Sequence, residues 1–359
     1  MSDERGLAAS LVAQIQSVAG RIGRPVNIME VCGTHTVELR RQGIHSLLPT
    51  DIHLISGPGC PVCVTPSGYV DNAIRLVRDQ RVMVATFGDM LKVPGRDGES
   101  LSSFVSTGLV KLLYSPHDMI SLAEEHDGPV VFLAVGFETT TPTIVASYRE
   151  ARERGLRNFH LYTAFKTVPE VLQFLLADPS NTIDGFLLPG HVSVIIGERA
   201  YSFLQRPEGR PGVIAGFDAL DMLLGILILL RLIEKKEHRV ENGYPRAVRP
   251  EGNPRAREVV ERALYPRSDA WRGLGAVPGA SLGLRPELAE NDAEKVFSLP
   301  PAVDVEPPGC LCSKVIAGRA SPLQCALFAK RCQPDTPVGP CMVSSEGTCA
   351  AYYRYGAKR

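Results

Sequence analysis

Short apolar runs alternate with helical stretches between about residues 25 and 216, and this alternation limits the fold more than any other feature. Each run is rich in β-branched residues and ends in a loop containing glycine; the runs are "PVNIMEV", "IHLIS", "RVMVATF", "PVVFLAV", "FHLYTAF", "IDGFLL" and "GVIAG". Helical patterning lies between them, for example at 67–79 and 142–155. Continuous apolar runs of this length are typical of parallel strands buried on both faces. The sequence therefore predicts the α/β class with parallel sheets.

The same pattern divides the chain into three predicted domains. A break near 115–129 separates a first α/β domain, 1–120, from a second, 121–216, and we expect the two to face each other across a central cleft. The remaining part, 217–359, begins with an apolar helix and includes a polar stretch at 242–290 with little strand signal. Its last fifty residues hold six of the nine cysteines. We expect this end to be organised by metal and to have little regular structure.

Composition and charge exclude several classes of protein. The most apolar run, "MLLGILILLRLI" at 222–233, is too short to span a bilayer and contains Arg231, so a buried helix over 217–236 is expected. The N-terminus, "MSDERGLAASLVAQIQ", does not have the pattern of a signal peptide. Lys+Arg and Asp+Glu each number 39, which leaves no basic excess for nucleic acid or an anionic membrane. We expect a cytoplasmic protein, in which nine cysteines indicate metal or redox chemistry more than structural disulfides.

Polar and reactive side chains follow almost every predicted strand. In open parallel sheets, ligands bind beyond the carboxyl ends of the strands. Here these ends carry Cys32 and His35 in "EVCGTHT", Cys60 and Cys63 in "GPGCPVC", Asp89 in "FGDMLKVPG", Glu138 in "GFETTTPT", and His191 in "PGHVSVIIG". If the sheets face each other, these loops converge on one cleft. The simpler alternatives are a small buried cysteine at position 32, histidines that serve only as hydrogen-bonded loop residues, and threonines that cap a helix.

Cys60 and Cys63 are compatible with more than one kind of site. As half of a zinc site they would need a second CxxC or a histidine pair, and none lies within the next forty residues. A redox pair, or a pair acting with Cys32, fits better. Pro61 and the glycines before Cys60 suit an exposed turn in which a thiolate can be reached.

The C-terminal cysteines follow the order Cys310-x-Cys312-x12-Cys325-x6-Cys332-x8-Cys341-x7-Cys349. Six thiols so close together in an intracellular chain indicate a metal site. Four of them can hold an iron–sulfur cluster and leave a thiol pair beside it, whereas zinc bound by four cysteines is the alternative. The spacing alone does not say which four bind.

Seven blocks of the sequence together resemble the HypD family of hydrogenase maturation factors. They are "MEVCGTHT", "GPGCPVCVTP", "FGDMLKVPG", "GFETTTP", "LLPGHVSVIIG", "AGFDALD" and "GPCMVSSEGTCAAYYRYG". The resemblance covers about residues 20–356 and implies two α/β domains facing a cleft, with a third domain that holds a [4Fe–4S] cluster. It also implies a scaffold on which the Fe(CN)2CO group of [NiFe]-hydrogenase is built.

The resemblance further implies partners and site residues. The partners are HypC, a small chaperone, and HypE, which delivers cyanide from a thiocyanate, with HypF acting before it; the chain alone is expected to be a monomer. The iron of the Fe(CN)2CO group would bind at Cys32, near the redox-active CxxC, with His35, Glu138 and His191 as further catalytic candidates.

The cysteine-rich end is similar to that of ferredoxin:thioredoxin reductase. That similarity implies that the cluster ligands are Cys310, Cys325, Cys332 and Cys349. It leaves Cys312 and Cys341 as a neighbouring redox pair. Releasing cyanide from a thiocyanate breaks a C–S bond with two electrons, which a cluster beside a dithiol can supply, and soft thiolates suit the iron. The alternatives are a stand-alone thiol–disulfide oxidoreductase of the ferredoxin:thioredoxin type and a zinc-stabilised interaction protein.

Overall fold

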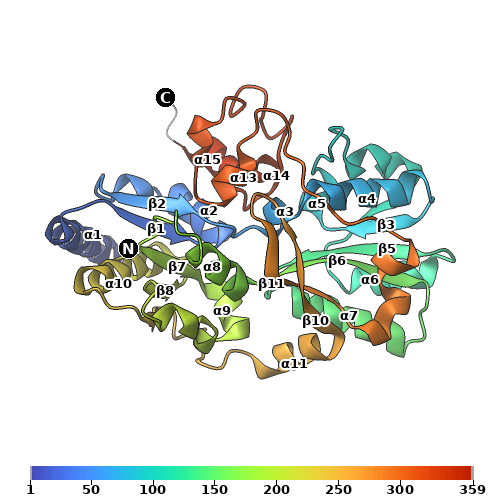
Figure 1. The fold of residues 1–359 in the computed structure, drawn as a ribbon, viewed down its shortest axis with the longest axis horizontal. Helices are drawn as coiled ribbons and strands as arrows, with labels where there is room; N and C mark the ends of the chain where they lie inside the picture. Colours follow the sequence, from blue (N-terminus) through green and yellow to red (C-terminus); the bar gives the residue numbers. More distant parts are fainter. Residues whose placement is uncertain (1, 357–359) are drawn as a thin grey trace.

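The computed structural model describes residues 2–356. Two β-sheets lie side by side with helices on their faces, and the cysteine-rich C-terminal segment crosses above the junction between them (Figure 1). The predicted α/β class with two sheet-containing parts is confirmed.

The first sheet is entirely parallel, with the strand order β2-β1-β7-β8-β9. Its strands are β1 (Val26–Glu30), β2 (Ile52–Ser56), β7 (Gly185–Pro189), β8 (Gly212–Ala215) and β9 (Val240–Asn242). Two helices, α1 (Ser2–Ile22) and α10 (Ala219–Lys235), pack on each other and on this sheet through one buried apolar cluster. The run predicted as a buried helix is therefore α10.

The second sheet is mixed, with the strand order β10-β11-β6-β5-β3-β4. Its strands are β3 (Met83–Thr86), β4 (Val110–Leu112), β5 (Val130–Gly136), β6 (Phe159–Lys166), β10 (Leu264–Trp271) and β11 (Gly275–Leu284). Strands β6, β5, β3 and β4 are parallel, whereas β11 pairs antiparallel with both β6 and β10. All seven runs predicted as strands are strands of one sheet or the other.

Helices follow most strands in the chain. Besides α1 and α10, the helices before the C-terminal segment are α2 (Gly33–Arg41), α3 (Pro61–Val64), α4 (Ser67–Arg78), α5 (Gly88–Leu91), α6 (Asp118–Glu125), α7 (Thr141–Glu153), α8 (Val168–Leu176), α9 (Gly190–Ile196), α11 (Pro254–Ala263) and α12 (Ala293–Val296). Short 3-10 helices lie at Ile44–Ser46, Leu101–Thr107, Glu198–Gln205, Pro286–Asn291 and Pro322–Gln324. The helices predicted at 67–79 and 142–155 correspond to α4 and α7.

The strand pairing does not follow the predicted division of the chain at residues 120 and 216. β1 and β2 pair with β7 and β8, whereas β3 pairs with β5. α10, which was assigned to the C-terminal domain, packs on the first sheet. The apolar pattern identifies strands but does not say which strands pair, because buried parallel strands look alike in sequence. The chain thus crosses between the two sheets three times, after β2, after β6 and after β9.

The stretch 242–290 was wrongly expected to have little strand structure. It contains most of a hairpin, β10 and β11, that extends the second sheet. β10 is an edge strand that includes Pro266 and charged residues, which an edge strand tolerates because only one side of it is paired. These residues hide the strand from a reading based on continuous apolar runs.

The C-terminal segment has only short helices: α13 (Cys312–Ile316), α14 (Pro340–Val343) and α15 (Thr348–Tyr355). Before them, an extended stretch lies along the start of α4, where the Gly68 amide donates to the Val303 carbonyl at 3.0 Å. α15 packs on α2, with the Arg40 guanidinium 3.2 Å from the centre of the Tyr352 ring. The segment is therefore anchored on both sheet-containing parts.

One buried cluster joins all three parts at the centre of the molecule. It includes Val31 from the first sheet's side, Phe137 and Trp271 from the second, and Cys312 and Cys341 from the C-terminal segment. The candidate site residues are thus built into a shared core. None of the helices within residues 2–356 has the length and apolar character needed to cross a lipid bilayer.

The packing of α10 predicts a clear difference between two of its residues. Ile226 is fully buried in the cluster with α1, whereas Leu224 on the same helix is 40% exposed. We expect Ile226→Ala to lower the free energy of unfolding by about 2–5 kcal/mol because it leaves a cavity. Leu224→Ala should change it by less than about 0.5 kcal/mol. Urea titrations of the two variants make the comparison, and equal losses would contradict this packing.

Candidate functional site

Cys32 lies at the turn between a buried strand and a helix. It follows β1, precedes α2, and has an extended backbone with φ −114° and ψ 131°. The turn is crossed closely by the loop before α3: the Gly33 amide donates to the Gly59 carbonyl at 3.0 Å, and a side chain on Gly59 would overlap the Val31 carbonyl. A glycine is required there, which explains part of "GPGCPVC". The crossing brings the CxxC loop next to Cys32.

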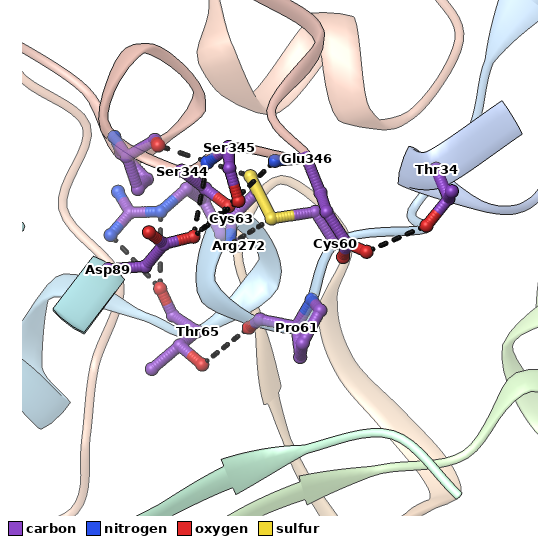
Figure 2. The surroundings of a disulfide bond; sticks show 11 residues. Thr34, Cys60, Pro61, Cys63, Thr65, Asp89, Arg272, Ser344, Ser345 and Glu346 are labelled. Carbon is purple, nitrogen blue, oxygen red and sulfur yellow. Dashed lines mark hydrogen bonds between the residues drawn. A yellow bond between two sulfur atoms is a disulfide. The ribbon is translucent and has the colours of Figure 1, made fainter. Parts of the chain in front are cut away.

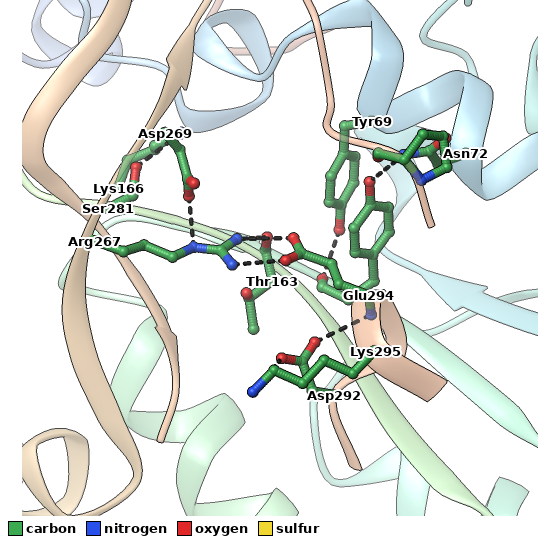
Figure 3. A network of polar contacts seen from close by, with 12 residues as sticks. Tyr69, Asn72, Thr163, Lys166, Arg267, Asp269, Ser281, Asp292, Glu294 and Lys295 are labelled. Carbon is green, nitrogen blue, oxygen red and sulfur yellow. Dashed lines mark hydrogen bonds and ion pairs between the residues drawn. The ribbon is translucent and has the colours of Figure 1, made fainter. Parts of the chain in front are cut away.

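The surroundings of Cys32 keep its thiol protonated. Burial of the thiol and the nearby Glu346 carboxyl raise the pKa of Cys32 to about 11. Glu346 is held in place by the Thr34 hydroxyl, which donates to its Oε1 at 2.8 Å (Figure 2). A thiol with this pKa is a poor nucleophile at neutral pH and becomes a good ligand only when a metal ion displaces its proton.

Two predicted histidines are brought together by a residue that the sequence analysis did not single out. The Phe217 ring lies between them, 4.7 Å from the His35 ring and 3.9 Å from the His191 ring, centre to centre. Phe217 belongs to "AGFDALD", the block that follows β8. The motif itself was the only signal that could have pointed to it.

His35 is neutral and has a defined tautomer. Its ring is fully buried, and burial lowers its pKa to about 4. Nε2 lies 3.0 Å from the Gly216 carbonyl, and since a carbonyl can only accept, Nε2 carries the proton. Nδ1 is then an acceptor, and it has no hydrogen-bond partner among residues 2–356.

Cys60 and Cys63 form a disulfide that is buried (Figure 2). Their side chains are only 5% and 2% exposed, so the expectation of an exposed turn is wrong. The C-terminal segment covers the pair, with the Cys63 sulfur 4.0 Å from the Pro340 carbonyl oxygen of α14. Pairing of these two cysteines agrees with the redox interpretation over half of a zinc site.

The loop after Cys341 joins the two sheet-containing parts. Asp89, from the second sheet's side, accepts hydrogen bonds from the Ser344 hydroxyl at 2.8 Å and the Ser345 amide at 3.1 Å. Glu346, one residue further on, accepts a hydrogen bond from the Thr34 hydroxyl, which lies on the first sheet's side. Figure 2 shows these contacts around the disulfide. The loop Ser344–Glu346 therefore fixes the cysteine-rich segment above the Cys32 and CxxC loops.

A buried arginine supports the other side of the disulfide loop. The Arg272 guanidinium donates to the Thr65 carbonyl at 3.1 and 3.2 Å and pairs with Asp304 at 3.1 Å. Only 1% of Arg272 is exposed. The sequence analysis missed Arg272 because it lies in the stretch where no strand was expected.

All six C-terminal cysteines line one cavity. The thiols of Cys310, Cys312, Cys341 and Cys349 are hydrogen-bonded in a row. The bond with Cys312 and burial raise the pKa of Cys310, and burial raises the pKa of Cys332. Without a metal ion the thiols of Cys310 and Cys332 are therefore protonated.

The donor set of this cavity fits an iron–sulfur cluster better than a single ion. Within residues 2–356, no three Cys, His, Asp or Glu side chains gather closely enough to hold one metal ion. A cluster makes a different demand, since its iron atoms take one thiolate each and the ligands surround a volume rather than a point. Six thiols around one cavity meet that demand, with two to spare.

Cys341 connects the two groups of thiols. Besides the six-cysteine cavity, it lines a second cavity together with Cys60, Cys63, Gly33 and Glu346. Cys341 therefore lies among the C-terminal thiols and also beside the disulfide, and the disulfide loop crosses the turn at Cys32. Sequence analysis placed these residues in separate motifs and left their order in space open.

Glu138 lies apart from the thiols. Its Oε1 accepts from the Val168 amide at 2.7 Å, and burial raises the pKa of Glu138 to about 8. It lines a cavity that contains none of the nine cysteines. The buried Tyr201 hydroxyl lies close enough to both Glu138 and Cys32 that each of them contributes to raising its pKa.

The fold and the row of thiols define a cysteine-rich α/β protein. Its sequence is similar to those of proteins that act in hydrogenase formation. Residues 6–356 match the HypD family, described as the Hydrogenase formation hypA family. Hydrogenase expression/formation protein HupD of Azotobacter chroococcum mcd 1 is 42% identical over 363 residues, covering 99% of this chain and 94% of that protein. Hydrogenase maturation factor HypD of Escherichia coli (strain K12) is 40% identical over 334 residues, covering 92% and 90%.

The chain belongs to the HypD family of hydrogenase maturation factors. Its role is in hydrogenase maturation.

The Glu346 carboxyl predicts how the reactivity of Cys32 depends on pH. Glu346→Gln removes a negative charge near the thiol but keeps an oxygen that accepts from Thr34, so the pKa of Cys32 should fall. The rate of iodoacetamide labelling of Cys32, measured by peptide mass spectrometry as a function of pH, should then rise at lower pH than in the unmodified protein. The exposed Glu287→Gln is the control. Identical profiles for all three proteins would contradict this assignment.

Proposed function

We propose that the protein is a scaffold and redox protein on which the Fe(CN)2CO group of [NiFe]-hydrogenase is assembled. The observation that carries this proposal is that Cys341 lines both the six-cysteine cavity and the cavity of the Cys60–Cys63 disulfide. Cys341 would thus pass electrons from the C-terminal thiols to the disulfide, whose loop crosses the turn at Cys32. Such a path suits a protein that delivers electrons to a metal-assembly site.

The incoming iron would be held at Cys32. A thiolate is a soft donor and suits the low-spin iron of a cyanide and carbonyl complex. The raised pKa of Cys32 fits a site that is inert until iron arrives, because iron takes the place of the proton. The neutral His35, with its unpartnered Nδ1, and His191 lie on either side of Phe217 and are candidates for supporting the site.

The thiol pairs would carry out a two-electron exchange. A thiolate of the Cys312/Cys341 pair attacks the Cys60–Cys63 disulfide, and the resulting mixed disulfide is resolved by the other thiol of the pair. The products are a Cys312–Cys341 disulfide and the two reduced thiols of the CxxC, so two electrons and two protons have moved. The reduced CxxC then supplies the two electrons that split a thiocyanate into a thiolate and cyanide.

The remaining cysteines, Cys310, Cys325, Cys332 and Cys349, would hold a [4Fe–4S] cluster, which, when bound, supplies single electrons. The protein's own contribution is to keep six thiols around one buried cavity and to place Gly339 against them, where a side chain would come within 3.1 Å of the Cys310 sulfur.

The proposed partners follow from the family resemblance. HypC would bring or share the iron, and HypE would present the thiocyanate made with HypF, all in the cytoplasm. The alternative function is a stand-alone thiol–disulfide oxidoreductase of the ferredoxin:thioredoxin type. Both functions need a substrate to reach the buried Cys60–Cys63 sulfurs, so an assay and not burial decides between them. Rapid reduction of thioredoxin without HypC would favour that alternative.

Cys32→Ala tests the scaffold directly. We expect a folded protein that keeps its cluster and binds HypC but shows no infrared bands of iron-bound cyanide and carbon monoxide. The reason is that the variant lacks the proposed thiolate ligand of the incoming iron. The measurement is the infrared spectrum of the HypC complex purified without air, with the unmodified protein as control. Normal bands in the variant would show that Cys32 is not the essential iron ligand, and Cys60 or Cys63 would be the next candidate.

A second set of variants tests the division of the C-terminal cysteines. Cys325→Ala or Cys332→Ala should lose the cluster iron and sulfide, because each removes a proposed ligand. Cys312→Ala and Cys341→Ala should keep the cluster but leave the Cys60–Cys63 disulfide oxidised after a reductant is added. Iron and sulfide analysis and mass spectrometry of the disulfide distinguish the two groups. Loss of the cluster in Cys312→Ala would show that Cys312 is a cluster ligand and not a member of the redox pair.

A further inference from the structure

A separate cavity of about 480 Å³ lies where the two sheet-containing parts meet, and contains no cysteine. Its walls come from the starts of α7 and α8 at the strand ends of the second sheet, from the end of α9 in the first part, and from α11. α9 and α11 lie on the side of the molecule away from α13–α15 (Figure 1). The size, the position between two domains and the position at strand ends are all typical of sites for small molecules.

Three residues of this cavity have polar atoms without a partner. Glu138 Oε2, Thr167 Oγ1 and Glu170 Oε2 are buried and form no hydrogen bond within residues 2–356. Glu138 and Thr167 are themselves only 8% and 9% exposed. Buried polar atoms are rarely left unpaired in folded proteins because their dehydration is then uncompensated. Three of them around one cavity indicate an occupant that forms the missing bonds.

The three groups lie close together and differ in what they offer. The Glu138 carboxyl binds the amide of Val168, the residue after Thr167, and Glu170 is near enough to affect the charge state of Glu138. Burial raises the pKa of Glu138 to about 8, so it keeps its proton at neutral pH. Because Oε1 accepts from Val168, the free Oε2 is the O–H donor. The Thr167 hydroxyl is a second donor, and the Glu170 oxygen is an acceptor.

We propose that this cavity binds a small molecule that carries a carboxamide group. The amide oxygen accepts from Glu138 and Thr167, and the amide NH₂ donates to Glu170. A carboxylate ligand is disfavoured, because it has no donor for Glu170. The other charged side chains on the cavity wall, Arg199 and Arg257 with Glu251 and Glu261, are equal in number and give no excess positive charge for an anion. The apolar side chains of Ile195, Ile196 and Leu282 complete the walls and suit a short aliphatic part of the ligand. This site goes beyond the proposed function and does not rest on it.

The first test uses acetamide as the probe and acetate as the control, with binding to the full chain followed by saturation-transfer NMR. We expect saturable acetamide binding and no competition by acetate. Thr167→Val should weaken acetamide binding about tenfold, the equivalent of about 1.4 kcal/mol, because it removes one hydrogen bond at nearly constant shape. Glu287→Gln, which is exposed and outside the cavity, should bind as the unmodified protein does.

Two substitutions of Glu138 distinguish hydrogen-bond donation to the ligand from a role in packing alone. Glu138→Gln keeps a neutral side chain with a donor and should retain binding, whereas Glu138→Leu should abolish it. Circular dichroism establishes that each variant is folded, and if Glu138→Leu does not fold, Thr167→Val decides the matter. Absence of acetamide binding, equal binding of acetate, or full binding by Thr167→Val would overturn the proposal. None of these results bears on Cys32 or on cluster content, so the two proposals fail separately.

Discussion

The loop Ser344–Glu346 is the contact on which the candidate site depends. Through hydrogen bonds to Asp89 on one side and Thr34 on the other, it holds the cysteine-rich segment against loops from both sheets. Neither sheet alone has a cavity of thiols. The C-terminal segment has only short helices, and these polar contacts position it together with the core that it shares with Phe137 and Trp271. The three parts therefore act as one unit, in which the thiols of one part reach the strand ends of another.

Burial shifts the pKa values of thiols and histidines at the centre in opposite directions and leaves both kinds of group neutral. It keeps thiols such as Cys32 and Cys310 protonated, and it keeps His35 neutral. A site with so little charge does not attract or activate ligands by itself. In the proposed function it becomes reactive when a metal ion replaces thiol protons or when electrons open the buried disulfide. Chemistry at this centre is thus controlled by what is delivered to it, as suits a protein of hydrogenase maturation.

Glu138 illustrates how similar motifs that follow strands of different sheets can line different cavities. The carboxyl ends of β1 and β5 were expected to converge, yet the turn after β1 faces the thiols and the turn after β5 faces a cavity without them. The tertiary structure separates the two because β1 and β5 belong to different sheets. The motif "GFETTTP" therefore has its own structural setting, distinct from that of "EVCGTHT".

The sequence by itself determined seven of the eleven strands of the described residues and the presence of a cysteine-rich end. Apolar runs marked seven strands, because a strand buried on both faces must be apolar throughout, and cysteine spacing marked a thiol site. Only the tertiary structure decided which strands pair, since hydrogen bonds between backbones carry no side-chain signature, and so the chain crosses between sheets where none was expected. It also decided that the CxxC is buried, that Phe217 joins His35 to His191, and that Cys341 links two groups of thiols. These are contacts between segments far apart in the chain, which local patterns do not record.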